Sequence, residues 1–346
     1  MSRPKIHPVV WSPPPAPERA HPPHAGEDMP EPELVPVGGI GPEDVAVGPD
    51  GSVVTGVADG RILRLRESGA GAIGETIDET IAETIADTGG RPLGVEFTAD
   101  GALIVCDAYR GLLRVHPDTG HIDTLVAEVD GRPLLLCDNA AVASDGSVYF
   151  SDSSQRFTLA HWRADLYEHS GTGRLLRWRP GAGVEVLLDG LQFANGVALA
   201  ADESFVAVAE TGSYRISRLW LTGPQAGERE VLIDNLPGFP DNISTGAQGR
   251  IWIALASPRN RLLDWAHTKH PVLRKAVWAL PTALQPQPER IAWVLAVDAD
   301  GRVVRDFQRT GGYHMVTGVR EHAGTLYLGS LVERSVAVVD LSRAGP

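Results

Sequence analysis

Short stretches that alternate apolar and polar residues recur along the chain, each interrupted by a turn that contains Asp-Gly or an equivalent pair. The stretch from Val45 to Gly56 is typical, because VAV leads into the turn GPDGS and then into VVTG. Asp-Gly between two alternating runs is among the strongest short-range signals for a β-hairpin. The pattern therefore predicts pairs of antiparallel strands joined by tight turns.

The same hairpin occurs six times, at intervals of roughly 50 residues apart from a longer last interval that holds an insertion. The copies are DVAVGPDGSVVTG from Asp44, GVEFTADGALIVCD from Gly94, NAAVASDGSVYFSD from Asn139, GVALAADESFVAVAE from Gly196, NISTGAQGRIWIAL from Asn242 and GVREHAGTLYLGS from Gly318. A further strand pair follows most hairpins, and units of this length and content are typical of propellers rather than sandwiches. We therefore expect an all-β fold, a six-bladed β-propeller with four antiparallel strands per blade, over residues 35–346.

Three segments lie outside this repeat. Residues 1–34 centre on WSPPPAPERAHPPH, which is too rich in proline for helix or sheet, so we expect a proline-rich N-terminal arm that is extended over the domain or partly disordered. Insertions at 156–172 and 258–281 follow the hairpins of the third and fifth units. Apolar residues of the second insertion recur at helical spacing, which predicts short helical insertions that form a lid over one face. Helices packed on a blade edge are the alternative.

Composition narrows the classes of function. The net charge of -13 at pH 7 argues against nucleic acid and anionic membrane as partners, since both are bound through basic patches, but it is compatible with a bound cation. No apolar run reaches the roughly 20 residues that span a bilayer, and the first residues contain no apolar stretch like that of a secretion signal. With two cysteines, Cys106 and Cys137, we expect a cytoplasmic protein without a disulfide framework. The sequence leaves open whether these two cysteines form a disulfide bond with each other, and it indicates no oligomeric state.

Polar residues gather where the predicted innermost strands begin. These strands line the central channel of a propeller, so their first residues surround one mouth. The aligned hairpins place there Glu43, Leu93, Asp138 with Asn139, Asn195, Asp241 with Asn242, and Thr317. Carboxylate and amide oxygens without thiolates or clustered imidazoles suit a hard divalent cation, and calcium best. We therefore predict that oxygen atoms of this ring bind Ca²⁺ or another divalent cation. The alternative for each residue is that it caps its own turn.

The runs CDNAAVASDGSVYFSDSS, FANGVAL, GFPDNIS and REHAGTLYLGSL resemble the strictosidine synthase-like branch of six-bladed propellers, which includes adipocyte plasma membrane-associated proteins and their bacterial relatives. The chain is more distantly similar to paraoxonases and gluconolactonases, and the resemblance extends from about Gly38 to the end. It implies metal-ligand roles for Glu43, Asn195, Asp241 and Asn242, and we predict these four residues and Asn139 as the ligands of the ion. Many relatives have Asn-Asp where this chain has Asp138-Asn139, so which of these two faces the ion stays open.

Two departures from the families bear on the reaction. Thr317 stands where strictosidine synthase carries its catalytic glutamate, which disfavours an amine-aldehyde condensation. Leu93 stands where paraoxonases carry one histidine of their catalytic pair. The resemblance therefore implies neither of these two catalytic arrangements at its usual place.

The residues and the resemblance together favour a calcium-dependent hydrolase of the lactonase or esterase type, acting on a small apolar or aromatic lactone or ester. The ion would polarise the carbonyl group while a nearby base activates water. Asp138 and His314 are the candidate bases, and a purely structural role is the alternative for His314. A strictosidine synthase-like condensing or ring-forming enzyme, and a non-catalytic binding propeller with a structural ion, are the alternative functions.

Overall fold

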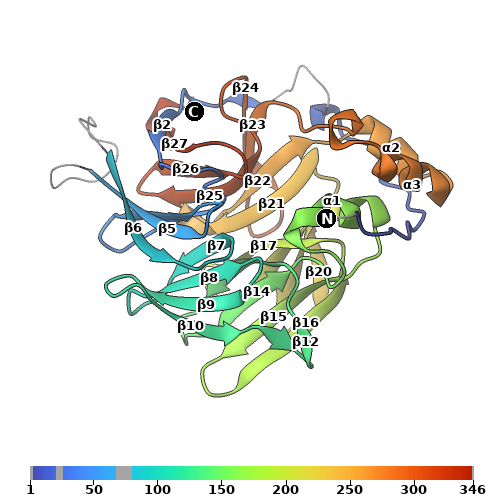
Figure 1. Ribbon diagram of the computed structural model, residues 1–346. Helices are drawn as coiled ribbons and strands as arrows, with labels where there is room; N and C mark the ends of the chain where they lie inside the picture. Colours follow the sequence, from blue (N-terminus) through green and yellow to red (C-terminus); the bar gives the residue numbers. More distant parts are fainter. Residues whose placement is uncertain (1–2, 21–25, 68–79, 345–346) are drawn as a thin grey trace.

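The computed structural model describes residues 3–20, 26–67 and 80–344 and is a six-bladed β-propeller (Figure 1). The fold prediction is confirmed, because six sheets, each with four successive antiparallel strands, surround one axis. Blades are numbered here in chain order. Blade 1 contains β3 (Val45–Val47), β4 (Val53–Gly56), β5 (Arg61–Glu67) and β6 (Thr80–Asp87), and blade 2 contains β7 (Pro92–Phe97), β8 (Leu103–Asp107), β9 (Gly111–His116) and β10 (His121–Val126). Blade 3 contains β13 (Cys137–Val142), β14 (Val148–Asp152), β15 (Gly173–Arg179) and β16 (Gly183–Leu191).

Of the remaining blades, blades 5 and 6 include strands from the N-terminal part of the chain, whereas blade 4 does not. Blade 4 contains β17 (Ala194–Leu199), β18 (Phe205–Glu210), β19 (Arg215–Trp220) and β20 (Arg229–Ile233), and blade 5 contains β21 (Gly238–Thr245), β22 (Ile251–Pro258), β23 (Ile291–Val297) and β24 (Val303–Thr310), with β1 (Glu27–Asp28) added in parallel to β24. Blade 6 contains β25 (Val316–His322), β26 (Thr325–Ser330), β27 (Ser335–Asp340) and, outermost, β2 (Glu33–Pro36). Because β2 pairs antiparallel with β27 near the other end of the chain, it closes the ring. The division predicted between residues 34 and 35 runs through β2.

The hairpin turns form as their sequences predict. Asp50, Asp145 and Asp202 each accept a hydrogen bond from the backbone amide two residues later, at 3.0, 2.8 and 3.0 Å. Such a side-chain bond offers the backbone a turn in place of a continued strand. Gly51, which follows Asp50, has a φ of 77°, a conformation that glycine adopts without steric cost.

The core of the molecule lies between the blades. Six apolar clusters each join one blade to the next around the ring. In β22, for example, Ile251 and Ile253 pack toward blade 4, whereas Trp252 packs toward blade 6. Successive side chains of a strand point to opposite faces, so an inner strand that is apolar throughout is buried on both faces. Cys106 and Cys137 are free thiols buried together in the cluster between blades 2 and 3.

Three short α-helices from the two predicted insertions meet on one side of the propeller (Figure 1). They are α1 (Trp162–Glu168) from blade 3 and α2 (Arg261–His267) and α3 (Pro271–Ala279) from blade 5. Smaller elements are the hairpin β11 (Glu128–Val129) and β12 (Arg132–Pro133) and the 3₁₀ turns η1 (Glu18–Ala20), η2 (Leu159–His161), η3 (Thr211–Ser213), η4 (Ala247–Gly249), η5 (Thr282–Leu284) and η6 (Leu341–Arg343). In the described part of the chain, no helix is long and apolar enough to cross a membrane.

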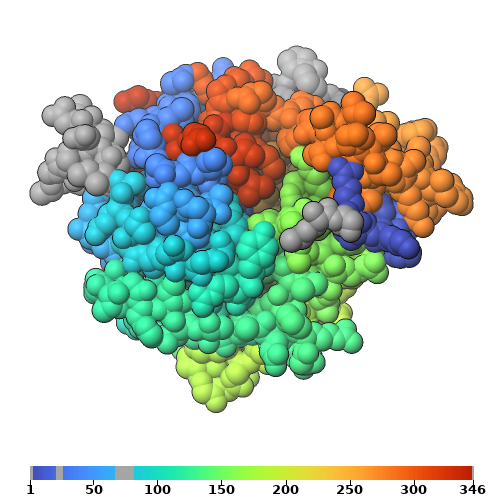
Figure 2. Space-filling view, in the orientation of Figure 1, coloured from blue at the N-terminus to red at the C-terminus, as the bar shows by residue number. Residues whose placement is uncertain are grey.

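Residues 3–11 of the N-terminal arm lie along these helices. Figure 2 shows the dark blue arm against the orange insertion of blade 5 and the green surface of blade 3. The Trp11 ring stacks on His169 with centroids 4.1 Å apart. The fully buried Arg274 of α3 donates to the carbonyl oxygens of Val9, at 2.6 Å, and Tyr167, at 2.9 Å. The arm therefore links α1 to α3.

Candidate active site

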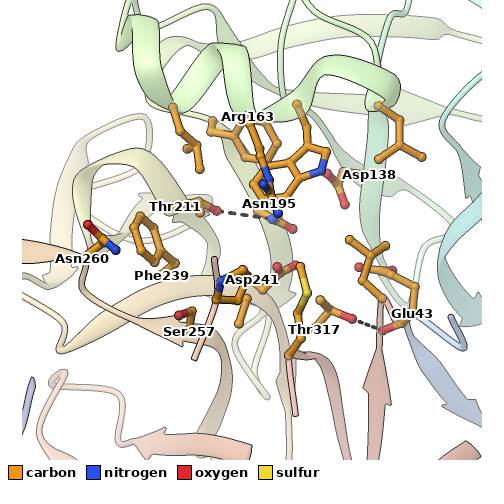
Figure 3. Close-up of a pocket in the computed structure, with 18 of the residues that line it drawn as sticks. Glu43, Asp138, Arg163, Asn195, Thr211, Phe239, Asp241, Ser257, Asn260 and Thr317 are labelled. Carbon is orange, nitrogen blue, oxygen red and sulfur yellow. Dashed lines mark hydrogen bonds between the residues drawn. The ribbon is translucent and has the colours of Figure 1, made fainter. Parts of the chain in front are cut away.

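All six blades contribute their predicted ring position to one cavity. It encloses about 1000 Å³, counting the open solvent at its mouth. Its floor is formed by the six residues that begin the inner strands: Glu43, Leu93, Asp138, Asn195, Asp241 and Thr317. Figure 3 shows the polar ones among them pointing into the same space. The alignment of the hairpins therefore correctly predicts that these six residues meet at one cavity, although they are far apart in the chain.

A shift in strand pairing explains why the ring residues face the cavity. The pairing of the inner strand with the next strand slips between Pro92 and Val95, Cys137 and Ala140, Ala194 and Val197, Pro240 and Ile243, and Val316 and Gly318. Such bulges leave residues unpaired and re-aim their side chains, often beside functional sites. In five blades, the residues inside the slip are the ring residues.

Glycines beside the ring residues let neighbouring blades approach closely. A Cβ atom at Gly94 would lie 2.7 Å from the carbonyl oxygen of Asp138, and one at Gly196 would lie 2.6 Å from the Cα atom of Asn242. Real Cβ atoms do not approach backbone so closely, so any larger residue would push the inner strands apart. These glycines therefore set the width of the ring.

Hydrogen bonds hold the floor residues in place. Glu43 Oε1 accepts from Asn242 Nδ2 at 3.0 Å, and the Thr317 hydroxyl donates to the Glu43 carbonyl oxygen at 2.8 Å. Asp138 Oδ2 accepts from the Ser153 hydroxyl at 2.6 Å. Asn195 Nδ2 donates to the Thr211 hydroxyl oxygen at 3.3 Å, as Figure 3 shows. The carboxylate and amide side chains are therefore oriented before any ligand binds.

The three floor carboxyl groups have raised pKa values. Burial, followed by the charges of Asp138 and Asp241, raises the pKa of Glu43 well above its ordinary value. Burial raises the pKa of Asp138 from 3.8 to about 7, against the opposing hydrogen bond from Ser153. Burial and the charge of Asp138 raise the pKa of Asp241, although a hydrogen bond from Asn195 opposes the shift. Like charges that share a low-dielectric site disfavour one another, so this floor favours either protons or a cation.

The donor atoms of the floor fit a hard divalent cation. Glu43 Oε2 and Asn195 Oδ1 in the floor, and Asn242 Oδ1 behind it, are buried and have no hydrogen-bond partner among the described residues. An unpaired buried oxygen is costly, and ligation would satisfy it. Within the described ranges, no three Asp, Glu, His or Cys side chains form a cluster that could hold a metal. A cation here would therefore require amide oxygens together with the carboxylates.

Three of the predicted site residues do not line the cavity. Asn139 bonds to Asp44 Oδ2 at 3.0 Å and accepts from the Val197 amide at 2.9 Å, so Asp138 is the member of that pair that faces the cavity. Asn242 lies behind Glu43 as its hydrogen-bond donor. The imidazole of His314 lies between Glu333, which it contacts through Nδ1, and Arg290, which is 3.1 Å from Nε2.

The roof of the cavity is apolar and comes mainly from the insertions. Trp162, Leu166 and Tyr167 of α1 and Leu263 of α2 line it. Phe193, Phe239 and Met315 extend the apolar wall between roof and floor. The predicted lid is therefore present over the site, but Trp162 is the only one of its three tryptophans that lines the cavity. Trp265 is 50% exposed, and Trp278 is buried against Tyr167.

Several cavity residues were not predicted from the sequence. Ser153 and Thr211 position the floor, and Arg163 of α1 enters from the roof. Phe193 and Met315 have φ angles of 60° and 51°, which are unusual for large side chains and often accompany functional sites. Each stands two residues before a ring residue, Asn195 or Thr317, so a shared offset from the repeat is the signal that could have found them.

Solved structures with the same architecture support the fold. A gluconolactonase from Xanthomonas campestris superimposes with a TM-score of 0.64 at 18% identity, over 97% of this chain and 98% of that one. The calcium-binding protein regucalcin from Agrobacterium tumefaciens gives a TM-score of 0.61 at 14% identity, over 91% and 95% of the two chains. At these identities the likeness concerns the fold.

Closer relatives share more of the sequence. The family model for strictosidine synthase matches residues 138–224, and that for the strictosidine synthase-like N-terminal region matches residues 27–65. Protein strictosidine synthase-like 6 of Arabidopsis thaliana is 36% identical over 303 residues, which cover 87% of this chain and 79% of the relative. Adipocyte plasma membrane-associated protein of Salmo salar is 34% identical over 319 residues, which cover 88% and 76%. The chain therefore belongs to the strictosidine synthase-like family of six-bladed propellers.

Proposed function

We propose that this protein is a hydrolase that opens lactones or cleaves esters in the cavity with the help of a divalent cation, calcium by the chemistry of its oxygen donors. The observation that carries the proposal is the set of three enclosed carboxyl groups and unpaired amide oxygens beneath an apolar roof. Apolar pockets with a few convergent polar groups are the common form of small-molecule sites. Strongly shifted pKa values in such a pocket are typical of acid-base chemistry.

We assign different roles to the floor residues: some would bind the cation, and one would act as the general base. Glu43, Asn195 and Asp241 would hold the cation, and Asn242 would orient Glu43. A calcium ion bound there would act as a Lewis acid toward the substrate carbonyl oxygen. Asp138 suits the role of general base because it faces the cavity beside these residues, and because burial raises its pKa to about 7 in the absence of a cation.

Hydrolysis then needs one base. Asp138 takes a proton from a water molecule, whose oxygen forms a bond to the carbonyl carbon. The bond from that carbon to the leaving oxygen breaks, and the leaving oxygen receives the proton held by Asp138. The products are a carboxylic acid and an alcohol, or a single hydroxy acid from a lactone, and the base is restored. The apolar roof would bind the organic part of the substrate and exclude bulk water.

The test is hydrolysis of a panel of lactones and phenyl esters by the purified protein, before and after EDTA and after calcium is restored. We expect activity that EDTA abolishes and calcium restores. Activity that is indifferent to chelation would remove the cation from the proposal. A protein that hydrolyses no member of the panel, but melts at a lower temperature when Asn195 or Asp241 is replaced, would instead be a binding propeller with a structural ion.

One observation favours a second candidate, a condensing or ring-forming enzyme, because the strictosidine synthase family model matches residues 138–224. Thr317 argues against it: its side chain lines the cavity at the position expected for the catalytic glutamate and offers no acid. The measurement is product formation from an amine and an aldehyde together, compared with each alone.

A further inference from the structure

Arg163 is the one cationic side chain in the wall of the candidate active site. It projects from α1 into the cavity (Figure 3) and is the only Lys, Arg or His among the described residues that line it. Its Nη1 atom is buried and has no hydrogen-bond partner in the described part of the chain. The Trp162 ring lies beside the guanidinium, with the Cζ atom 5.3 Å from the ring centroid. The guanidinium group of Arg163 can therefore donate a further hydrogen bond to a ligand in the cavity.

Two arginines that are buried outside the cavity form hydrogen bonds within the fold, although the Nε atom of Arg274 also has no partner among the described residues. Arg174 bonds to Asp152 at 2.6 Å, and Arg274 donates to two backbone carbonyl oxygens. Leaving one guanidinium nitrogen buried and unbonded costs free energy that a ligand would recover. The cation that lowers the pKa values of Glu43 and Asp138 is Arg91 rather than Arg163, so Arg163 is not needed as the counter-ion of these two groups.

We propose that Arg163 selects substrates that carry a carboxylate on an apolar body, so that the preferred lactone or ester is acid-bearing. This inference rests on the proposed hydrolase function. A guanidinium binds a carboxylate through two parallel charge-assisted hydrogen bonds, which gives both affinity and orientation. A single arginine balances a single negative charge, which favours a carboxylate over a doubly charged phosphate.

The positions of Arg163 and of the proposed cation indicate how such a substrate would be oriented. Arg163 lies in the roof and the residues that would hold the cation lie in the floor, so the carboxylate would bind at the roof and the ester carbonyl group would lie at the floor. The apolar body then contacts the wall formed by residues such as Phe239. The net charge of -13 gives the protein no general attraction for anions, so any preference for an acid must come from this local contact.

The experiment compares 4-acetoxybenzoate with its neutral methyl ester in the wild-type protein, in Arg163→Met and Arg163→Lys, and in the control Arg261→Met. Arg261 is exposed at the start of α2, so its replacement removes the same charge from the lid outside the cavity. Each kcat/KM is divided by the uncatalysed rate of its ester. We expect a preference of about ten- to hundredfold for the acid in the wild type, near the worth of a charge-assisted pair. It should be kept in Arg261→Met, reduced in Arg163→Lys and lost in Arg163→Met.

Equal rates on both esters in the wild type, or a preference that survives Arg163→Met, would overturn the role of Arg163 while the hydrolase function stands. If neither these esters nor any member of the panel is cleaved, the hydrolase function fails, and calorimetry with 4-hydroxybenzoate decides the inference separately. Binding that weakens at least tenfold in Arg163→Met supports an acid-binding arginine, and binding that is absent or independent of Arg163 refutes it.

Discussion

Replacing Asp138 with Asn should make the metal-free protein more stable at neutral and alkaline pH while it removes hydrolysis. Asp138 is 5% exposed, and burial raises its pKa from 3.8 to about 7. The folded protein therefore keeps a proton that the unfolded chain releases near pH 4, so the free energy of unfolding falls as the pH rises from about 4 to about 7. Asn has nearly the same shape and can accept the Ser153 hydrogen bond, but it has no proton to lose.

The size of the effect follows from the pKa difference. About three pKa units at about 1.4 kcal/mol per unit give about 4 kcal/mol in favour of the variant above pH 8, and well under about 1 kcal/mol near pH 4. Other groups titrate in the same range. Burial lowers the pKa of His169 to about 4, so its contribution to stability rises between pH 4 and its unfolded value of 6.5, in the opposite direction to that of Asp138. Because His169 is present in both proteins, its titration cancels in the difference between them.

The assay is urea unfolding of the wild type and of Asp138→Asn in EDTA at pH 4, 6 and 8. The control is Asp202→Asn, which changes an acid in an exposed hairpin turn. We expect the stability difference between Asp138→Asn and wild type to grow with pH and that of the control to stay level. A difference that is the same at pH 4 and pH 8 would mean that Asp138 is charged throughout, and the reasoning from burial would be refuted.

Three other changes test separate parts of the molecule. Asp241→Asn should abolish the rise in melting temperature that calcium gives the wild type, whereas Asp202→Asn should keep it; a full calcium shift in Asp241→Asn would exclude that residue as a ligand. His314→Gln should lower kcat/KM by less than about threefold and Asp138→Asn by at least about a hundredfold, near the usual worth of a general base; the reverse order would make His314 the base. Trp11→Ala should cost about 1–3 kcal/mol of unfolding free energy and raise KM more than it lowers kcat, and an unchanged KM would contradict a role of the arm in placing the lid.

The blades and the floor could be predicted from the sequence because both depend on a repeated local pattern. Each hairpin carries its own turn signal, and Asp50 shows that the signal works through a bond within the turn itself. Once the hairpins are aligned, the closed ring makes equivalent positions meet. This is why Glu43 and Asp241 could be placed at one site although 198 positions, 241 minus 43, separate them.

The roof could not be predicted in the same way, because its residues belong to insertions that occur once each. The helical spacing predicts a lid, but not that Trp162 faces the cavity while Trp265 faces solvent. That difference depends on how α1 and α2 pack against the arm, which the local sequence does not specify. The pair Asp138-Asn139 shows the same limit within the ring, because the slip in strand pairing decides which side chain faces inward.

The floor buries three carboxyl groups whose pKa values are raised, and this arrangement indicates a functional role for the ring residues. Three buried carboxyl groups, of which Asp138 raises the pKa values of Glu43 and Asp241, lie beside unpaired amide oxygens. A purely structural propeller could remove this conflict by apolar substitution at little cost to its core. Leu93 shows that such a residue fits the ring. Conflicts between local chemistry and stability are expected at functional sites. Protons and a divalent cation are the two ways to resolve this one, so the same oxygens govern both the pH dependence of stability and the affinity for the cation.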